Sequence, residues 1–244
     1  MTYKRNADIW FPYGRVVAFR SNRPLAALES QWLEDVRMKT GKVFWIASKC
    51  RTMSRREEYV DELRQYIDVD IYGQCGNLTN NADYSHLSSH YKFYLSFENS
   101  LCDDYVTESF FRALQKPVVP VVMGGANYSC LAPPHSYIDA TQRTPRQLAA
   151  YLHQLDADDG AYLRYFHWKV NYTVETGARL MARHAFCHLC AKLHSPNPLK
   201  FYRNLVDEMG SQSQCRHHDA SWWLSSPTEN IESTTESGEA QSKD

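Results

Sequence analysis

Residues 91–137 decide the fold, and they read YKFYLSFENSLCDDYVTESFFRALQKPVVPVVMGGANYSCLAPPHSY. The segment 92–97 is rich in aromatic and apolar residues, which favours a short strand. The segment 107–114 predicts a helix, and 118–122 is a continuous apolar run, typical of a strand buried on both faces. A strand, a helix and a buried strand in this order form a βαβ unit, so the two strands should be parallel.

The polar segment between the first strand and the helix falls where such folds bind ligands. In an open parallel sheet, ligands sit beyond the carboxyl ends of the strands, where helix N-termini point. Those N-termini favour anions, because their N–H groups are unpaired and the helix dipole adds partial positive charge. Asp104 or Thr107 can cap this helix. We therefore predict that Asn99, Tyr105 and Glu108 lie at an anion-binding edge.

A second unit of the same kind precedes the first. The segment 43–47 (VFWIA) predicts a buried strand, 55–67 predicts a helix with one apolar face, and 69–72 predicts the next strand. Residues 74–90 are polar and indicate a surface loop. Alternating strands and helices of this kind predict an α/β fold with a Rossmann-like parallel sheet and flanking helices.

The C-terminal third of the chain has weaker signals. Thr144 and Pro145 mark the start of a helix, because threonine can cap and proline suits the first turn. Residues 173–193 predict a long helix. From residue 210 onward the chain is rich in Ser, Gln, Glu and Thr and poor in aliphatic residues, which predicts disorder.

Composition excludes some classes of function. The net charge is −1 with acids and bases interspersed, whereas nucleic-acid binding needs a basic face. A membrane-spanning helix needs about twenty consecutive apolar residues, and this sequence has no such run. Seven cysteines and N-glycosylation patterns at Asn77, Asn127 and Asn171 favour an oxidising lumen. The odd cysteine count leaves at least one thiol without an intrachain partner.

Two segments carry a resemblance to a known family. FENSLCDDYVTE at 97–108 and PVVPVVMGGANYSCLAPPHSYIDA at 117–140 resemble the signature of the α1,3-fucosyltransferases, glycosyltransferase family 10. Weaker similarity runs over residues 8–190. The resemblance implies the C-terminal half of a GT-B glycosyltransferase. It also implies an inverting transfer of fucose from GDP-fucose to N-acetylglucosamine of a glycoprotein glycan, in α1,3 linkage.

The resemblance also sets an expected domain organisation. Family members are usually type II Golgi proteins with an N-terminal anchor and an acceptor-side domain, and residues 1–14 resemble the segment that joins the two family domains. We expect an inter-domain linker and entry segment at 1–40, a GDP-fucose-binding domain at 41–209 and a disordered tail at 210–244. The expected location is the Golgi lumen, with membrane contact only through an anchor that this chain lacks. The catalytic base is expected in the N-terminal domain, so none is named here.

The resemblance assigns donor contacts to particular residues. Arg56 takes the place of the family's donor-binding arginine, whose planar fork can bond two diphosphate oxygens; the alternative is a solvated arginine. Glu108 matches a donor-contacting glutamate, although an acid in a first turn also complements the helix dipole. The other expected contacts with the donor are made by Asn99, by Tyr94 and Tyr105 along the nucleotide, by Tyr13 beside it, and by Ser48 near a phosphate. Packing is the alternative for Tyr94 and Tyr13.

Two positions depart from the family pattern. Ser109 stands where the family usually has a lysine that neutralises the donor phosphates, which should weaken GDP binding. Lys49 stands in an SKC segment where the family usually has SNC. Our hypothesis is that Lys49 partly replaces the missing charge. A poorly active protein is the alternative.

A metal site and two other functions are alternatives to this interpretation. Cys187 and Cys190, with Cys215, His217 and His218 further on, fit zinc-ligand spacing only loosely. The alternatives for the close pair are a local disulfide or a disulfide to another loop. The donor edge has no DxD motif, so we expect no required cofactor and at most stimulation by a divalent cation. A catalytically inactive GDP-sugar-binding fragment is the alternative function. An unrelated nucleotide-binding domain is disfavoured, because no glycine-rich phosphate loop follows the segment 43–47.

Overall fold

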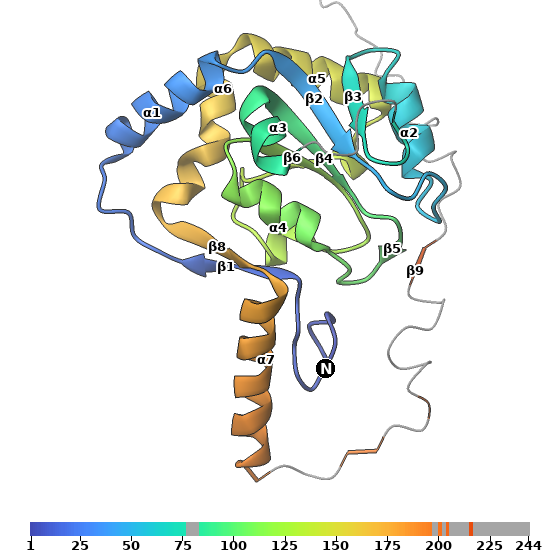
Figure 1. Cartoon of the computed structure of the whole chain (residues 1–244), viewed down its shortest axis with the longest axis vertical. Coiled ribbons are helices and arrows are strands. Elements are labelled where there is room, and N and C mark those ends of the chain that lie inside the picture. The colour runs from blue at the N-terminus through green and yellow to red at the C-terminus, as the bar shows by residue number, and fades with distance from the viewer. Residues whose placement is uncertain (77–82, 197–199, 202–203, 205–214, 217–244) are drawn as a thin grey trace, which may run out of the picture.

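The centre of the protein is a parallel β-sheet. A computed structural model of the chain describes residues 1–76, 83–196, 200–201, 204 and 215–216. Its five-stranded sheet has the order β3-β2-β4-β6-β7, and every neighbouring pair is parallel (Figure 1). The strands are β2 Gly41–Ile46, β3 Val69–Tyr72, β4 Tyr91–Phe97, β6 Val119–Met123 and β7 Ile138–Asp139. The predicted parallel α/β sheet is confirmed.

Helices cover both faces of the sheet. Because side chains alternate along a strand, Phe93 and Leu95 of β4 face one apolar cluster while Tyr94 faces another. The first cluster packs under α1 Leu25–Arg37, α2 Arg56–Leu63, α5 Pro145–Ala157 and α6 Asp159–Leu163. The opposite face packs under α3 Tyr84–His90 and α4 Glu108–Gln115. All seven residues of β4 are buried, as expected for the central strand.

The predicted start of α5 is confirmed in detail. Thr144 accepts a hydrogen bond from the Gln147 backbone N–H at 3.2 Å, and the Gln147 side chain accepts one from the Thr144 N–H at 3.0 Å. Pro145 opens the first turn. This reciprocal capping box satisfies N–H groups that would otherwise have no partner.

The cap predicted for α4 is wrong. Thr107 does precede the helix, but its hydroxyl donates to a Glu98 carboxylate oxygen at 3.1 Å instead of accepting from the first turn. Asp104 lies in a turn with φ of 60° and does not cap the helix. The first N–H groups of α4 therefore have no side-chain cap.

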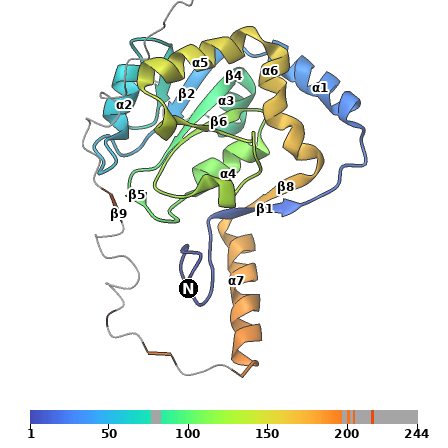
Figure 2. The same ribbon diagram turned by 180° about the vertical axis from the view of Figure 1, so that it is seen from behind.

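The long helix predicted at 173–193 begins later than expected. Its first residues form β8 Tyr172–Thr176, which pairs antiparallel with β1 Gly14–Ala18. β-branched residues at 173, 174 and 176 favour a strand, and Gly177 adopts φ of 102° before α7 Ala178–Leu193 begins. Figures 1 and 2 show α7 projecting from the end of β8 away from the sheet.

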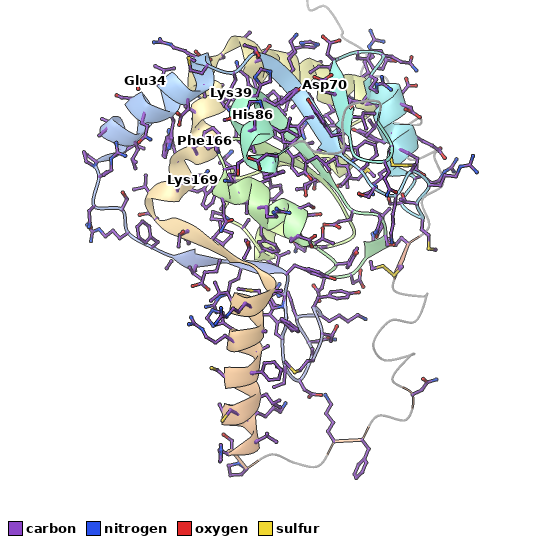
Figure 3. All side chains as sticks on the ribbon, in the orientation of Figure 1. Glu34, Lys39, Asp70, His86, Phe166 and Lys169 are labelled. Carbon is purple, nitrogen blue, oxygen red and sulfur yellow. A yellow bond between two sulfur atoms is a disulfide. The ribbon has the colours of Figure 1, made fainter. Side chains whose placement is uncertain are left out.

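Sequence patterns missed three further elements. The stretch 1–40, expected to be a linker and entry segment, contains β1 and α1. The expected loop at 74–90 contains α3, whose start is capped by Asp83 through the Ser85 N–H at 3.1 Å. Lys39, seen beside α3 in Figure 3, donates to the carbonyls of Ser88 at 2.8 Å and Tyr91 at 3.0 Å. These bonds connect the end of α1 to the junction of α3 and β4.

Short elements complete the described part of the chain. They are the 3₁₀ turns η1 Tyr128–Cys130, η2 Ala140–Gln142 and η3 Arg164–Val170, and the strands β5 Leu101–Cys102 and β9 Cys215–Arg216, which pair antiparallel. The remainder of the tail predicted at 210–244 lies outside the described residues. No helix within the described ranges is long and apolar enough to cross a membrane.

Two disulfides join distant parts of the sequence. Cys50 pairs with Cys75, and Cys102 pairs with Cys215. Because Cys215 is bonded, it is not available to the zinc-type set considered above, and His217 and His218 lie outside the described residues. Cys130, Cys187 and Cys190 are free and exposed, so the close pair on α7 forms no local disulfide.

Candidate functional site

A cavity of about 390 Å³ lies at the carboxyl edge of the sheet. It is lined by residues at the ends of β2 and β4 and at the beginnings of α2 and α4. Six of the eight residues predicted to contact the donor line this cavity: Tyr13, Arg56, Tyr94, Asn99, Tyr105 and Glu108. Parallel strands bring these residues to one edge although they are far apart in sequence.

The other two predicted contacts, Ser48 and Lys49, are exposed and do not line the cavity. Lys49 contributes through its backbone, since its carbonyl accepts a hydrogen bond from Arg56 Nη2 at 3.4 Å. The loop that follows β2 therefore helps to hold Arg56. Charge compensation by the Lys49 side chain stays a prediction.

Arg56 is the cation of this cavity. It opens α2, its guanidinium lies over the Trp45 ring at 5.4 Å, and Nη1 donates to the Phe97 carbonyl. Burial lowers the pKa of Arg56, while the nearby charge of Glu98 acts in the opposite direction. The buried Nε atom has no hydrogen-bond partner among the described residues. Arg56 is therefore held by packing and carbonyl contacts and is not a freely solvated side chain.

Glu98, which sequence reasoning left unassigned, also lines the cavity. It is 2% exposed and accepts hydrogen bonds from the Thr107 N–H at 2.8 Å and the Thr107 hydroxyl at 3.1 Å. Burial raises the pKa of Glu98 to about 7, although the Thr107 hydrogen bonds and Arg56 favour the ionised form. Its place directly after β4, beside Asn99, was the available sequence signal.

Ser109 takes part in a cluster of hydroxyl groups. Its Oγ lies 3.0 Å from Ser96 Oγ and 3.0 Å from Thr107 Oγ1. A serine at this position therefore faces the end of β4 and adds no charge to the cavity. Among the described residues that line the cavity, Arg56 is the only lysine or arginine.

Three tyrosines give the cavity aromatic walls. The rings of Tyr13 and Tyr105 lie 6.5 Å apart in an edge-on arrangement, and Tyr94 is buried in β4. Burial raises the pKa of Tyr105 to about 12 and raises the pKa of Tyr94, so both phenols are neutral at physiological pH. Neutral tyrosines offer ring faces and hydroxyl groups to a nucleoside or a sugar.

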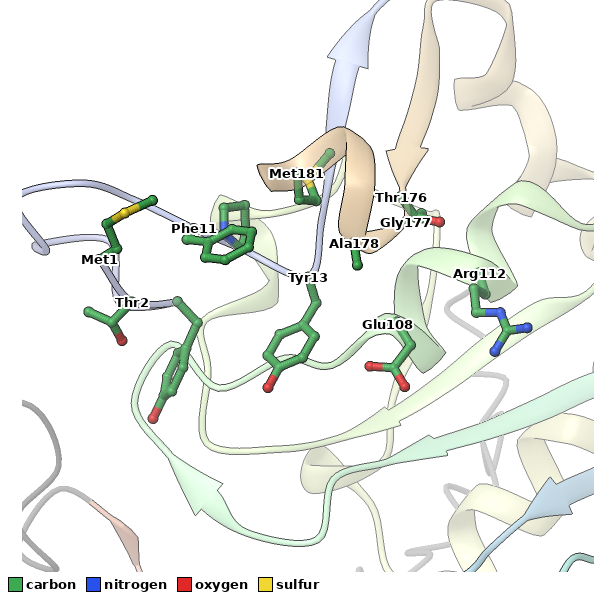
Figure 4. A pocket seen from close by; sticks show the side chains of 12 residues that line it. Met1, Thr2, Phe11, Tyr13, Glu108, Arg112, Thr176, Gly177, Ala178 and Met181 are labelled. Carbon is green, nitrogen blue, oxygen red and sulfur yellow. The ribbon is translucent and has the colours of Figure 1, made fainter. Parts of the chain in front are cut away.

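A second cavity, of about 700 Å³, adjoins the first and shares Tyr13 and Glu108 with it. Figure 4 shows Tyr13 and Glu108 on this shared wall, with Phe11 and Met181 further along. The Glu108 carboxylate is exposed and so can contact ligands in either cavity. The second cavity is mostly apolar but also has Arg112 in its lining, whereas Arg56 and Glu98 line only the first.

Fold and site together define a class of protein. A parallel sheet that places an arginine, carboxylates and tyrosines around one cavity at its carboxyl edge has the architecture of a ligand-binding α/β domain. The family model described as Glycosyltransferase family 10 (fucosyltransferase) C-term matches residues 36–208. The chain therefore belongs to glycosyltransferase family 10.

Known relatives agree with this assignment. The chain is 38% identical over 244 residues to Alpha-(1,3)-fucosyltransferase C of Drosophila melanogaster, covering 93% of this chain and 53% of that protein. It is 38% identical over 218 residues to Glycoprotein 3-alpha-L-fucosyltransferase A of the same species, covering 84% of this chain and 42% of that protein. The chain thus spans about half the length of these curated relatives.

A solved structure supports the fold. The crystal structure of an alpha1,3-fucosyltransferase with GDP-fucose matches with a TM-score of 0.50 at 17% sequence identity, covering 74% of this chain and 60% of that one. At this identity the likeness concerns the fold alone. The predicted fold class, part of a GT-B glycosyltransferase with a parallel sheet and flanking helices, is confirmed.

Proposed function

We propose that this chain binds GDP-fucose in the 390 Å³ cavity and supplies the donor side of an α1,3-fucosyltransferase. The acceptor in this proposal is an N-acetylglucosamine unit of a glycoprotein glycan, and the reaction inverts the configuration at the fucose carbon. The observation that carries the proposal is that Arg56, Asn99, Tyr105 and Glu108 line one cavity in a member of this family.

Each part of the donor has a matching group in the cavity. Arg56 faces the diphosphate, because its buried Nε has no partner among the described residues and an anion can accept from it. Tyr94, Tyr105 and Tyr13 surround the nucleoside, Asn99 offers an amide to a hydroxyl or phosphate, and the exposed Glu108 accepts from sugar hydroxyls.

The chemical step builds negative charge on the departing GDP. As the bond between the fucose C1 and the diphosphate oxygen breaks, preorganised donors at that oxygen lower the barrier. Arg56 and the uncapped N-terminus of α4 are such donors, since the first N–H groups of the helix and its dipole favour an anion. The base that deprotonates the acceptor hydroxyl is not assigned to this chain.

The proposed location is the Golgi lumen, an oxidising compartment. The disulfides Cys50–Cys75 and Cys102–Cys215 support this location, as does exposure of the glycosylation-pattern residues Asn127 and Asn171. Asn77 lies outside the described residues. The proposal includes no required cofactor, so affinity for GDP-fucose should be the same with and without a metal chelator.

Calorimetry with GDP-fucose tests the donor site. We expect saturable binding that is weakened by Arg56→Ala and competed by GDP, and no comparable binding of UDP-sugars. A parallel assay with a glycopeptide acceptor measures transfer. Absence of GDP-fucose binding by the folded chain contradicts the proposal, and binding without transfer limits the chain to donor binding.

A further inference from the structure

The side chains that line the cavity include more carboxylates than cations, and this excess disfavours an anionic ligand. The acidic and basic side chains among the described lining residues are Arg56, Glu98 and Glu108, which amount to one cation and two carboxylates. A nucleotide-sugar diphosphate brings further negative charge into the same space. Like charges at close range disfavour binding strongly where the surroundings are partly buried.

Of the two carboxylates, Glu98 is the one whose surroundings favour protonation. It is 2% exposed, whereas Glu108 is exposed to solvent. Its contacts with Thr107 come from an N–H and a hydroxyl, and one carboxyl oxygen, Oε1, accepts both. The other oxygen can therefore take a proton without breaking either bond.

The groups that face Glu98 from neighbouring elements are mostly neutral or acidic. α2 contributes Arg56, α4 contributes Glu108, and β4 contributes Tyr94. The segment before α4 contributes Tyr105, and η1 contributes Tyr128. Arg56 is the single positive charge in this group, and an incoming diphosphate competes for it.

We propose that Glu98 takes up one proton from solvent when the nucleotide-sugar diphosphate binds, so that donor binding is coupled to protonation of this buried carboxylate. The proton adds to the carboxylate oxygen that faces away from Thr107, and no covalent bond to the ligand forms. Protonation removes the attraction between Glu98 and Arg56, so the charge of Arg56 acts on the diphosphate alone. This inference rests on the proposed function and adds a pH dependence to the same site.

The direction of the pH dependence follows from the charges. Burial already raises the pKa of Glu98 to about 7, so the free site holds a mixture of both forms near neutral pH. A bound diphosphate raises that pKa further, because it adds negative charge and pairs with Arg56, whose charge otherwise favours ionised Glu98. Affinity therefore falls as pH rises above about 7, by at most about tenfold per pH unit.

Calorimetry in buffers with different ionisation enthalpies counts the protons taken up. The diphosphate diester of GDP-fucose has no group that titrates between about pH 6 and 8, so uptake reports on the protein. For the full chain at about pH 7.5 we expect uptake of a substantial fraction of one proton, and a several-fold loss of affinity from about pH 6.5 to 8.

Glu98→Gln is the decisive variant, because glutamine keeps the shape and can still accept from Thr107. It should bind GDP-fucose with no proton uptake and an affinity that does not change with pH. The matched control, Glu108→Gln, should bind more weakly but retain the uptake. Wild-type binding without uptake overturns the inference, and so does full uptake in Glu98→Gln.

The binding measurements distinguish failure of the proposed function from failure of the proposed Glu98 protonation. If the folded wild-type chain does not bind GDP-fucose at any pH, the proposed function is rejected. If it binds with pH-independent affinity, the function stands and the protonation of Glu98 is rejected. Should Glu98→Gln fail to fold, infrared spectroscopy of the wild-type chain decides, because the protonated carboxyl band must grow when the ligand is added, and an unchanged band rejects the inference.

Discussion

The Glu98 carboxylate accepts a hydrogen bond from the Thr107 backbone N–H at 2.8 Å, which connects the carboxyl end of β4 to the beginning of α4. The strand is buried along its whole length, so Glu98 is held by a rigid element. The helix that follows Thr107 supplies Glu108 and Ser109 to the same cavity. A single buried carboxylate thus positions the first turn of α4 relative to the sheet.

Burial of Glu98 makes the stability of the unliganded protein depend on pH, because it raises the pKa more than the Thr107 hydrogen bonds lower it. The pKa of Glu98 rises from 4.5 to about 7 in the folded state, so the folded state binds a proton more tightly than the unfolded state. The contribution is fully present below about pH 4.5 and is lost as pH rises through about 7, by up to about 3 kcal/mol. In Glu98→Gln this loss should disappear.

Urea denaturation of both proteins at about pH 5 and pH 8 checks the expectation. The variant should be the more stable of the two at the higher pH, because it buries no charge. Equal pH dependence in the two proteins would contradict the assignment of the raised pKa to Glu98. The quantity to compare is the urea concentration at the midpoint of unfolding, provided that the slope of the unfolding free energy against urea is the same in both proteins.

Arg56 should contribute strongly to donor binding. Arg56→Ala removes charge-assisted hydrogen bonds of about 1.5–3 kcal/mol, so the dissociation constant for GDP-fucose should rise about 10- to 100-fold. Arg56→Lys keeps the charge but loses the planar fork and the contact with Trp45. It should fall between wild type and alanine, as measured by calorimetry. Alanine binding as tightly as wild type would remove Arg56 from the site.

The central sheet and the site edge were predictable from sequence for a physical reason. Buried parallel strands are continuous apolar runs, and the segments around 92–97 and 118–122 have the length and composition of such strands. Polar residues directly after such strands must lie at the carboxyl edge. This rule, together with the family resemblance, placed Arg56, Asn99 and Glu108 at one cavity.

The missed features depend on contacts that sequence patterns do not contain. β8 exists because residues 172–176 pair with β1, which lies far away in the sequence. The importance of Glu98 likewise comes from burial and from Thr107, and an acid after a strand is common on surfaces.

The missing lysine at position 109 leads to a paired prediction. If Lys49 compensates for Ser109, Lys49→Ala should raise the dissociation constant for GDP several-fold, even though Lys49 does not line the cavity. Ser109→Lys should lower that constant by bringing a second cation to the lining, at some cost in stability from the lost contacts with Ser96 and Thr107. An unchanged constant in Lys49→Ala rejects the compensation.

Removal of the hydroxyl group should affect the stability of the protein differently at two buried tyrosines. The Tyr128 hydroxyl is buried and has no partner among the described residues, and an unsatisfied buried polar group costs about 1–3 kcal/mol. Tyr128→Phe should therefore leave stability unchanged or raise it. Tyr59 donates to the Arg143 carbonyl at 2.9 Å, so Tyr59→Phe should destabilise by about 1 kcal/mol. Thermal unfolding of both variants measures the contrast.

The two disulfides should differ in their contributions to stability. Cys102 and Cys215 are 113 residues apart, and Cys50 and Cys75 are 25 apart. A crosslink that closes a longer loop restricts the unfolded chain more, which gives about 5 kcal/mol for the first pair and about 3.5 kcal/mol for the second. Replacing both cysteines of the first pair by serine should therefore lower the unfolding temperature more than the same change in the second.

The exposed free Cys130 provides the control, because Cys130→Ser breaks no bond and should leave the unfolding temperature unchanged. A larger loss from the Cys50–Cys75 pair would show that loop length does not decide the order. In that event the explanation lies in the folded state, since the second disulfide holds the loop whose Lys49 carbonyl contacts Arg56. Weaker GDP-fucose binding by the Cys50→Ser, Cys75→Ser double variant would then be the expected companion result.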